Sequence, residues 1–160
     1  MSHLRSGGET CTASNFVQLT EPNGIIASVS TQESICGSYK SPWMITALPG
    51  QTIRVHLVDF SVTPLTPEAV VSGVTCVAYA SIREQGVTRP TTVCGARQYD
   101  QMVYESRSNQ VEIIIQGSQQ NQRYFLLQYT CKCYYGVVYG ELDETAKNIR
   151  QCLSYSKAIS

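Results

Sequence analysis

Seven cysteines are the residues of this 160-residue chain best suited to chemistry. They lie at Cys11, Cys36, Cys76, Cys94, Cys131, Cys133 and Cys152. Cysteines form disulfides or bind zinc, and structural zinc sites bring their cysteines in closely spaced pairs. The first four are widely spaced, which favours disulfides. So many cysteines are typical of an oxidising compartment, and we therefore predict an extracellular location, either secreted or on a cell-surface ectodomain.

The three C-terminal cysteines cannot all pair with one another. Residues two apart in a strand share a face, so alternation does not decide whether Cys131 or Cys133 meets Cys152. One interpretation bonds one of the two to Cys152 and leaves the other free or bonded to a second chain, which would give a disulfide-linked dimer. The alternative is a metal site made of the three cysteines, although no fourth ligand lies nearby.

Catalytic residues do not stand out in the sequence. Of the two histidines, His3 lies in the polar start, and His56 alternates outward in a strand between Arg54 and Val58. No Gly-x-Ser-x-Gly, His-Glu-x-x-His or phosphate-binding glycine motif occurs, and the 12 acidic residues are scattered. We therefore predict a protein that is not an enzyme and has no catalytic residues.

The charge balance excludes several classes of partner. The formal net charge is zero and charged residues make up 15%, against roughly 25% in typical soluble domains. Nucleic acid and anionic membranes both require a concentrated basic surface. No apolar run approaches the length of about 20 residues that spans a bilayer. The start, MSHLRSGGET, lacks the apolar core of a signal peptide, so we expect a mature or excised piece of an ectodomain.

Short strands are the elements that must position these residues. In TIRVHLVDF (52–60), Ile53, Val55 and Leu57 alternate with more polar positions, and QVEIIIQG (110–117) alternates in the same way. Further strand-like runs are GIIASVS (24–30), WMITAL (43–48), VVSGVTCVAYASI (70–82) and QRYFLLQYT (122–130). The turn SQQN predicts a hairpin between the runs at 110–117 and 122–130. About eight short strands predict an all-β, antiparallel two-sheet sandwich.

The C-terminal segment has a different pattern. In 140–160, apolar residues recur at helical spacing, acidic residues occupy the first turn, and Lys157 lies near the end. This pattern predicts one amphipathic C-terminal helix.

The cysteines and the strands that follow them carry a resemblance to a known family. Cys36, 25 residues after Cys11, opens CGSYKSPWMITALPGQTIRVHLVDF, and Cys94, 18 residues after Cys76, opens CGARQYDQMVYESRSNQVEIII. This order resembles a CUB domain, the extracellular module of complement proteases, procollagen-processing enzymes, neuropilins and spermadhesins. The resemblance covers roughly residues 11–130, about three quarters of the chain.

The resemblance implies a jelly-roll-like sandwich with bridges Cys11–Cys36 and Cys76–Cys94. It divides the chain into a disordered start (1–10), a CUB-like domain (11–130) and an extension with a strand and the helix (131–160). The tail cysteines, Cys152 included, do not belong to the usual four of the family. The alternative is that the first four cysteines are buried and free.

The sequence departs from the family at the positions that bind calcium. Many members use acidic residues, one of them an aspartate shortly after the third cysteine. Here the segment after Cys76 reads CVAYASIREQG and has no acid before Glu84. Asp59 remains and Glu68 is nearby, but calcium needs several converging oxygen ligands. We therefore predict no cofactor and no metal, with calcium as the alternative, and interpret Asp59 as a strand-end or turn acid.

The family resemblance implies a function in protein binding. We expect a non-catalytic interaction module from the ectodomain of a receptor or co-receptor, whose partner is an extracellular protein ligand or co-receptor. The alternatives are an accessory module of a secreted protease or matrix protein, and a spermadhesin-like carbohydrate-binding protein. Tyr and Arg in loops are typical of interface centres, and those predicted to bind are Arg83, Arg89, Arg97, Tyr99, Arg107 and Arg123.

A second candidate is the tyrosine-rich run CYYGVVYG. Tyr134, Tyr135 and Tyr139 would either form an edge strand that pairs with a partner or pack beneath the helix.

Overall fold

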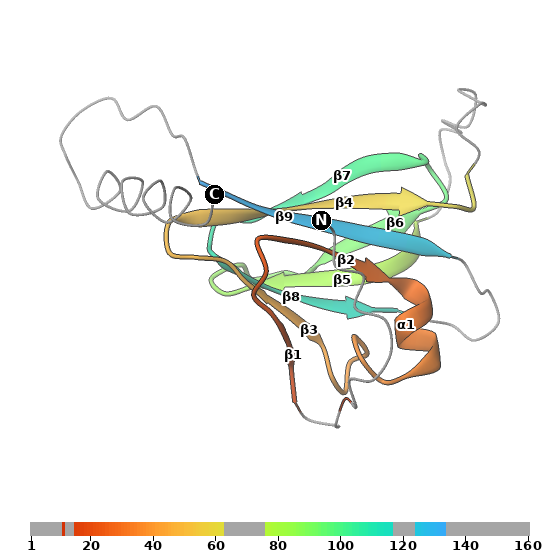
Figure 1. Ribbon diagram of the computed structural model, residues 1–160. Helices are drawn as coiled ribbons and strands as arrows, with labels where there is room; N and C mark the ends of the chain where they lie inside the picture. The colour runs from red at the N-terminus through yellow and green to blue at the C-terminus, as the bar shows by residue number, and fades with distance from the viewer. Residues whose placement is uncertain (1–10, 12–14, 63–75, 117–123, 134–160) are drawn as a thin grey trace.

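Two β-sheets packed face to face form the part of the protein that the computed structural model describes, residues 11, 15–62, 76–116 and 124–133 (Figure 1). The strands are β1 (Val17–Leu19), β2 (Asn23–Ala27), β3 (Trp43–Thr46), β4 (Gln51–Asp59), β5 (Val77–Glu84), β6 (Thr91–Gly95), β7 (Asp100–Glu105), β8 (Gln110–Ile115) and β9 (Phe125–Cys133). One short helix, α1 (Ser28–Glu33), follows β2. The predicted C-terminal helix at 140–160 lies outside the described residues.

The two sheets have five and four strands. The five-stranded sheet has the order β1-β3-β8-β5-β6, and the four-stranded sheet has the order β2-β9-β4-β7. Neighbouring strands are antiparallel except β1 and β3, which are parallel. Among the described strands, only β5 and β6 are consecutive in the chain and lie in the same sheet, so the chain crosses between the sheets at each of the other steps. The predicted all-β sandwich is thereby confirmed.

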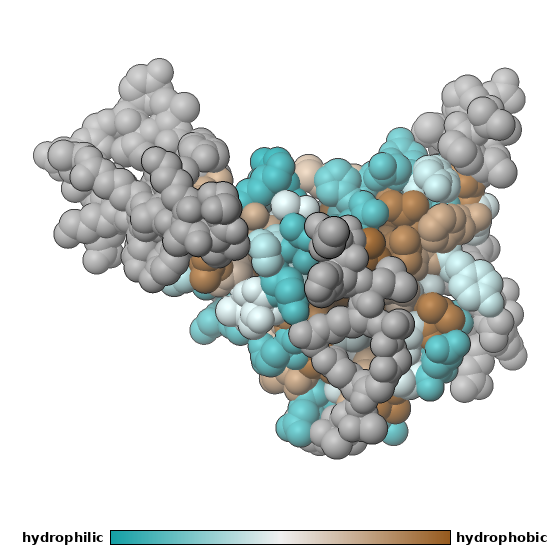
Figure 2. Space-filling model, viewed as in Figure 1, coloured by the Kyte–Doolittle hydropathy of each residue, from teal (hydrophilic) through white to brown (hydrophobic). Residues whose placement is uncertain are grey.

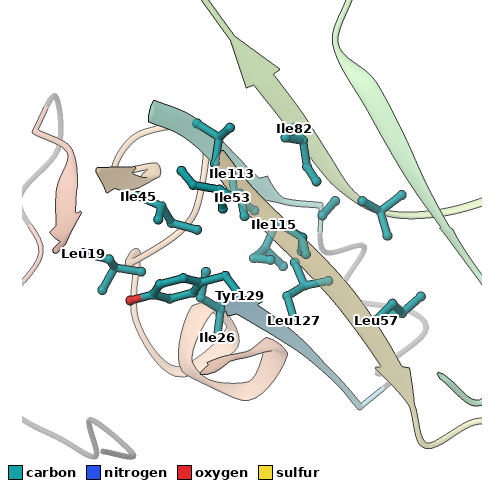
Figure 3. Packing of buried hydrophobic residues seen from close by; sticks show 14 of the residues in the cluster. Leu19, Ile26, Ile45, Ile53, Leu57, Ile82, Ile113, Ile115, Leu127 and Tyr129 are labelled. Atoms are coloured by element: carbon teal, nitrogen blue, oxygen red, sulfur yellow. The ribbon is translucent and has the colours of Figure 1, made fainter. Parts of the chain in front are cut away.

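The core lies between the sheets and is built from alternate residues of the central strands. Ile53, Val55 and Leu57 of β4 are fully buried, as the period-two pattern of the sequence predicts. The inward residues of β8 are Val111 and Ile113 together with Ile115. Figure 3 shows side chains of both sheets filling the space between them. Burying each of these side chains contributes about 1.5–3 kcal/mol.

The hairpin predicted between β8 and β9 is wrong. β8 pairs with β3 and β5, whereas β9 pairs with β2 and β4 in the opposite sheet. Both strands bury an apolar face, and they meet across the core instead of edge to edge. A polar turn between two such strands fits either connection, so the local sequence does not separate a hairpin from a sheet crossing.

The strand predicted at 24–30 ends early. β2 stops at Ala27, and Ser28 begins α1. Ser28 is buried, and its Oγ accepts a hydrogen bond from the backbone N–H of Phe125 at 3.1 Å. In a longer β2, a backbone carbonyl would accept this hydrogen bond from β9. Because the Ser28 hydroxyl accepts it instead, the backbone at Ser28 can leave the sheet and begin α1.

Two disulfides join segments that are 25 and 18 residues apart in the chain. Cys11 is bonded to Cys36 with a Cα–Cα distance of 5.3 Å, and Cys76 is bonded to Cys94 with a Cα–Cα distance of 5.1 Å. This is the pairing that the family resemblance implies. The second bridge joins the residue before β5 to β6, its neighbour in the five-stranded sheet.

The glycine that follows Cys94 is required by a close contact. The ring of Tyr79 lies over the Cα of Gly95, so that a Cβ at Gly95 would overlap it. Tyr79 is buried at a bulge of β5 and stacks on Phe125 of the other sheet, with ring centroids 4.5 Å apart. In the Cys-Gly pair, Cys94 therefore provides the covalent link to Cys76, and Gly95 leaves room for the ring of Tyr79.

The two tail cysteines of the described chain differ in state. Cys131 and Cys133 both lie in β9, where Cys131 is a free thiol with 8% exposure and Cys133 is disulfide-bonded. The predicted bond to Cys152 lies outside the described residues. Cys131 lies in β9 between β2 and β4 and is buried, so a bond from Cys131 to a second chain would require the sheet to open.

We expect Gly95→Ala to lower the free energy of unfolding by about 3 kcal/mol, because the added methyl group meets Tyr79 in a packed core. The matched control is Gly86→Ala, where φ is +83° and the methyl group meets open space. That change costs about 1 kcal/mol, the price of the left-handed backbone alone. Urea unfolding measures the free energy of unfolding of both variants. Equal losses of stability in the two would contradict the contact between Tyr79 and Gly95.

Burial raises the pKa of the Cys131 thiol to about 11. We therefore expect Cys131 to resist alkylation in the native protein at pH 8, where about one thiol in a thousand is ionised, and to react once denaturant exposes it. Peptide mass spectrometry after labelling provides the measurement. Rapid labelling of Cys131 without denaturant would contradict its burial, and Cys131→Ser controls for the assignment of the peptide.

Candidate binding surface

The structure distributes the predicted binding residues over separate surfaces. Arg97 and Tyr99 lie in the loop between β6 and β7, at one end of the sandwich. Arg89 and Arg107 lie in turns at the opposite end, before β6 and β8. Among the described residues, Arg97 and Tyr99 therefore share one end of the sandwich, and Arg89 and Arg107 share the other.

The remaining two predicted residues do not join them. Arg83 lies on the outer face of the five-stranded sheet, where its side chain is near Glu112. Arg123 lies outside the described residues.

Three aromatic residues cluster where Arg97 and Tyr99 lie. Phe60 and Tyr124 are 53% and 52% exposed, and the ring of Tyr99 contacts Phe60 edge-on at 6.2 Å between centroids. The backbone N–H of Phe60 donates to the carbonyl of Tyr124 at 3.2 Å, which holds the ends of β4 and β9 together. We call Phe60, Tyr99 and Tyr124 the aromatic patch.

The apolar surface continues onto the outer face of the four-stranded sheet. Val58 of β4 and Leu126 of β9 are paired in register and half-buried, and Met102 of β7 is exposed. Figure 2 shows hydrophobic residues gathered on the side of the molecule where β4 ends and β9 begins. His56 and Asp100 lie at its margin, with His56 Nδ1 3.7 Å from the carboxylate.

A buried carboxylate fixes the aromatic patch from beneath. Asp59 is fully buried at the end of β4, and its Oδ1 accepts hydrogen bonds from the backbone N–H and the hydroxyl of Ser61, at 2.9 and 2.6 Å. Its Oδ2 accepts one from the N–H of Ala96 at 2.7 Å, and its own N–H donates to the carbonyl of Tyr99. Phe60 and Tyr99, which flank these bonds, are therefore held in fixed relative positions.

The loop that carries Tyr99 has a strained residue. Ala96 has a φ of 61°, a left-handed conformation that costs a residue with a Cβ about 1–2 kcal/mol. The hydrogen bond from its N–H to the buried Asp59 carboxylate offsets this cost, because an unpaired buried charge would be far less favourable.

The interpretation of Asp59 as a strand-end acid agrees with these contacts. Both of its carboxylate oxygens accept hydrogen bonds from protein donors. Within the described ranges no group of three or more His, Cys, Asp or Glu side chains is placed to hold a metal ion. Glu68, the other acid considered for calcium, lies outside them.

A second buried carboxylate organises the opposite end of the sandwich. Glu84, at the end of β5, accepts hydrogen bonds from the hydroxyl of Tyr104 at 2.7 Å and from the N–H groups of Arg107 and Ser108. Burial acts to raise the pKa of Glu84, but these bonds outweigh it and hold the pKa below its ordinary value. Burial, followed by the bond to Glu84, raises the pKa of Tyr104 to about 12.

Phe60 and Tyr124 were missed by sequence reasoning, which favoured arginines in loops. A signal was available for Phe60, because it ends the run TIRVHLVDF out of phase with the inward set Ile53, Val55 and Leu57. An aromatic residue that ends a strand and alternates with the inward-facing residues is expected to expose its ring. Tyr124 directly precedes β9, and only the pairing of β9 with β4 brings it beside Phe60.

No protein-family model and no curated protein matches the chain. Over the described residues, no helix has both the length and the apolar character needed to cross a membrane.

The Glu84 network predicts how stability depends on pH. Because the folded pKa of Glu84 is lowered, the unfolded chain binds its proton first, and we expect the free energy of unfolding to fall as the pH drops below about 4.5. Tyr104 acts in the opposite range, because the unfolded phenol ionises near pH 10 and the folded one near 12. Stability should therefore also fall as the pH rises through that window.

Urea unfolding across this pH series tests both effects. Glu84→Gln should cost about 1–3 kcal/mol at pH 7 by disturbing the buried hydrogen bonds and should flatten the acid limb. Tyr104→Phe should flatten the alkaline limb. Glu105→Gln, which changes an exposed glutamate at the end of β7, serves as the control and should change stability by about 0.5 kcal/mol or less. If the free energy of unfolding fell equally steeply at acid pH in the wild type and in Glu84→Gln, Glu84 would not be the source of the acid dependence.

Proposed function

We propose that the chain is a CUB-like extracellular module that binds another protein through the aromatic patch and performs no reaction of its own. Phe60 and Tyr124 carry the proposal, because both rings are half exposed on a backbone that the buried Asp59 holds rigid. The two-sheet sandwich and the two disulfides support the CUB-like reading of the sequence.

The aromatic patch has the composition of an interface centre. Aromatic residues, Met and Arg are enriched in the buried centres of protein interfaces, and here Arg97 lies in the same loop as Tyr99 and Met102 lies on β7 opposite His56. Polar residues such as His56 and Asp100 lie at the margin, where a rim remains wet. Contiguous exposed apolar surface of this kind is typical of an interaction site.

The rigidity of the aromatic patch reduces the entropic cost of binding a partner. A loop that must be ordered on association loses part of the binding energy to conformational entropy. Hydrogen bonds from Ser61 and Ala96 to Asp59 order this loop before any partner arrives. The rings of Phe60 and Tyr99 then bring contact area at little entropic cost.

The disulfides support a proposal for where this binding takes place. Two intramolecular bridges support an oxidising compartment. Within it, we propose a place in the ectodomain of a cell-surface receptor or co-receptor, with an extracellular protein ligand or co-receptor as the partner.

The decisive experiment displays the full chain as a multivalent probe against a library of extracellular protein ectodomains. We expect a specific partner whose affinity falls at least about tenfold with Phe60→Ala and again with Tyr124→Ala, since aromatic residues at interface centres each contribute about 2 kcal/mol or more. Surface plasmon resonance with the purified partner measures the loss.

The controls separate binding from folding. Val87→Ala removes an apolar side chain that is 39% exposed in the turn after β5, at the other end of the sandwich, and should leave this partner's affinity unchanged. Circular dichroism and melting temperature verify that all variants fold. A partner that binds the folded double variant as well as the wild type would refute a role for the aromatic patch.

A further inference from the structure

A second surface lies on the outer face of the five-stranded sheet and shares no residue with the aromatic patch. It is a shallow groove of about 400 Å³. The lining residues that matter for its chemistry are Phe16, Tyr39, Lys40, Arg83, Glu112 and Ile114. We call this surface the groove.

One wall of the groove is a loop pinned at several points. Gly37 donates to the carbonyl of Ser41 at 2.7 Å, and its own carbonyl accepts from Ile115 at the end of β8 at 2.7 Å. Ser41 is buried, and its hydroxyl donates to the carbonyl of Asn15. The disulfide at Cys36 secures the start of the same loop. Tyr39 and Lys40 are therefore presented on a rigid support.

The charges in the groove are not balanced. Lys40 is exposed and makes no ion pair with any described residue; its Nζ lies 5.8 Å from the centre of the Tyr39 ring. Arg83 is 59% exposed, and its ionic contact is 3.8 Å from Nη1 to Glu112, longer than a hydrogen bond. Two cations thus face one acid, and most guanidinium donors of Arg83 remain available.

The apolar part of the groove lies beside these cations. Phe16 and Tyr39 expose about half and three quarters of their surface, and Ile114 forms the floor although it points away from the core. A ligand that fits must therefore combine negative charge with an apolar group a few ångströms away.

We propose that the groove binds an acidic peptide segment of a partner protein, in which carboxylates alternate with apolar side chains. Lys40 and Arg83 hold the carboxylates, and an apolar side chain lies over Ile114 between Phe16 and Tyr39. Glu112 favours a peptide over a polysulfated sugar, because it accepts hydrogen bonds from peptide N–H groups and repels a ligand charged along its whole length.

Fluorescence polarisation with the full chain tests the proposal. The probe is a fluorescein-labelled, amidated decapeptide of alternating glutamate and leucine. We expect saturable binding that weakens when glutamine replaces glutamate, when serine replaces leucine, and when salt is raised. Binding that needs only the charge, or only the leucines, would overturn the proposal.

Paired variants locate the site. Lys40→Gln with Arg83→Gln should weaken binding about tenfold, because each exposed ionic contact contributes modestly and the two add. The control, Lys132→Gln with Arg107→Gln, removes the same charge from surfaces elsewhere and should change little. Tyr39→Ser tests the apolar wall without altering charge. Affinity equal in both double variants would overturn the assignment to the groove.

Other occupants give distinct outcomes. Tighter binding of a sulfated oligosaccharide that the glutamate–leucine peptide fails to displace would replace the proposal with a sugar site. Self-association in sedimentation experiments that Arg83→Gln abolishes would assign the groove to a second copy of the chain. Phe60→Ala should leave peptide binding intact, so that failure of this proposal and failure of the aromatic patch are separate results.

Discussion

Two buried carboxylates tie the two sheets together at opposite ends, and the aromatic patch depends on the rigidity that one of them, Asp59, provides. Asp59 belongs to the four-stranded sheet and binds the N–H of Ala96, which follows β6 of the five-stranded sheet. Glu84 belongs to the five-stranded sheet and binds Tyr104 of β7 in the other. A carboxylate in a dry site is tolerated only when its lone pairs are satisfied, so each one dictates the positions of the donors around it.

A disulfide, an aromatic stack and a buried carboxylate all stabilise the loops at one end of the sandwich. The Cys76–Cys94 bridge joins neighbouring strands of one sheet, and Tyr79 reaches from that sheet to stack on Phe125 of the other. The hydroxyl of Tyr79 lies 3.1 Å from that of Ser61, which itself donates to Asp59. Covalent, aromatic and charged contacts thus converge on one end of the sandwich, and that end carries the aromatic patch.

Sequence reasoning succeeded where a local pattern determines the structure. Period two in β4 and β8 revealed which residues face the core, and cysteine spacing gave the bridges once the family resemblance was recognised. It failed where a distant strand decides the outcome: β8 and β9 lie in different sheets, and Ser28 ends β2 because of Phe125, 97 residues away. The partners of Glu84 and the meeting of Phe60 with Tyr124 depend on the same long-range pairing, which a single sequence does not contain.

The two proposed surfaces have consequences when taken together. They lie on different sheets, so occupation of one leaves the other open. A packed core separates them, and we expect no energetic coupling between the two sites. Their chemistry also differs, since one is aromatic and the other joins cations to an apolar floor. Taken together, the two proposals describe a module that would bridge two proteins, with affinity for each partner set locally.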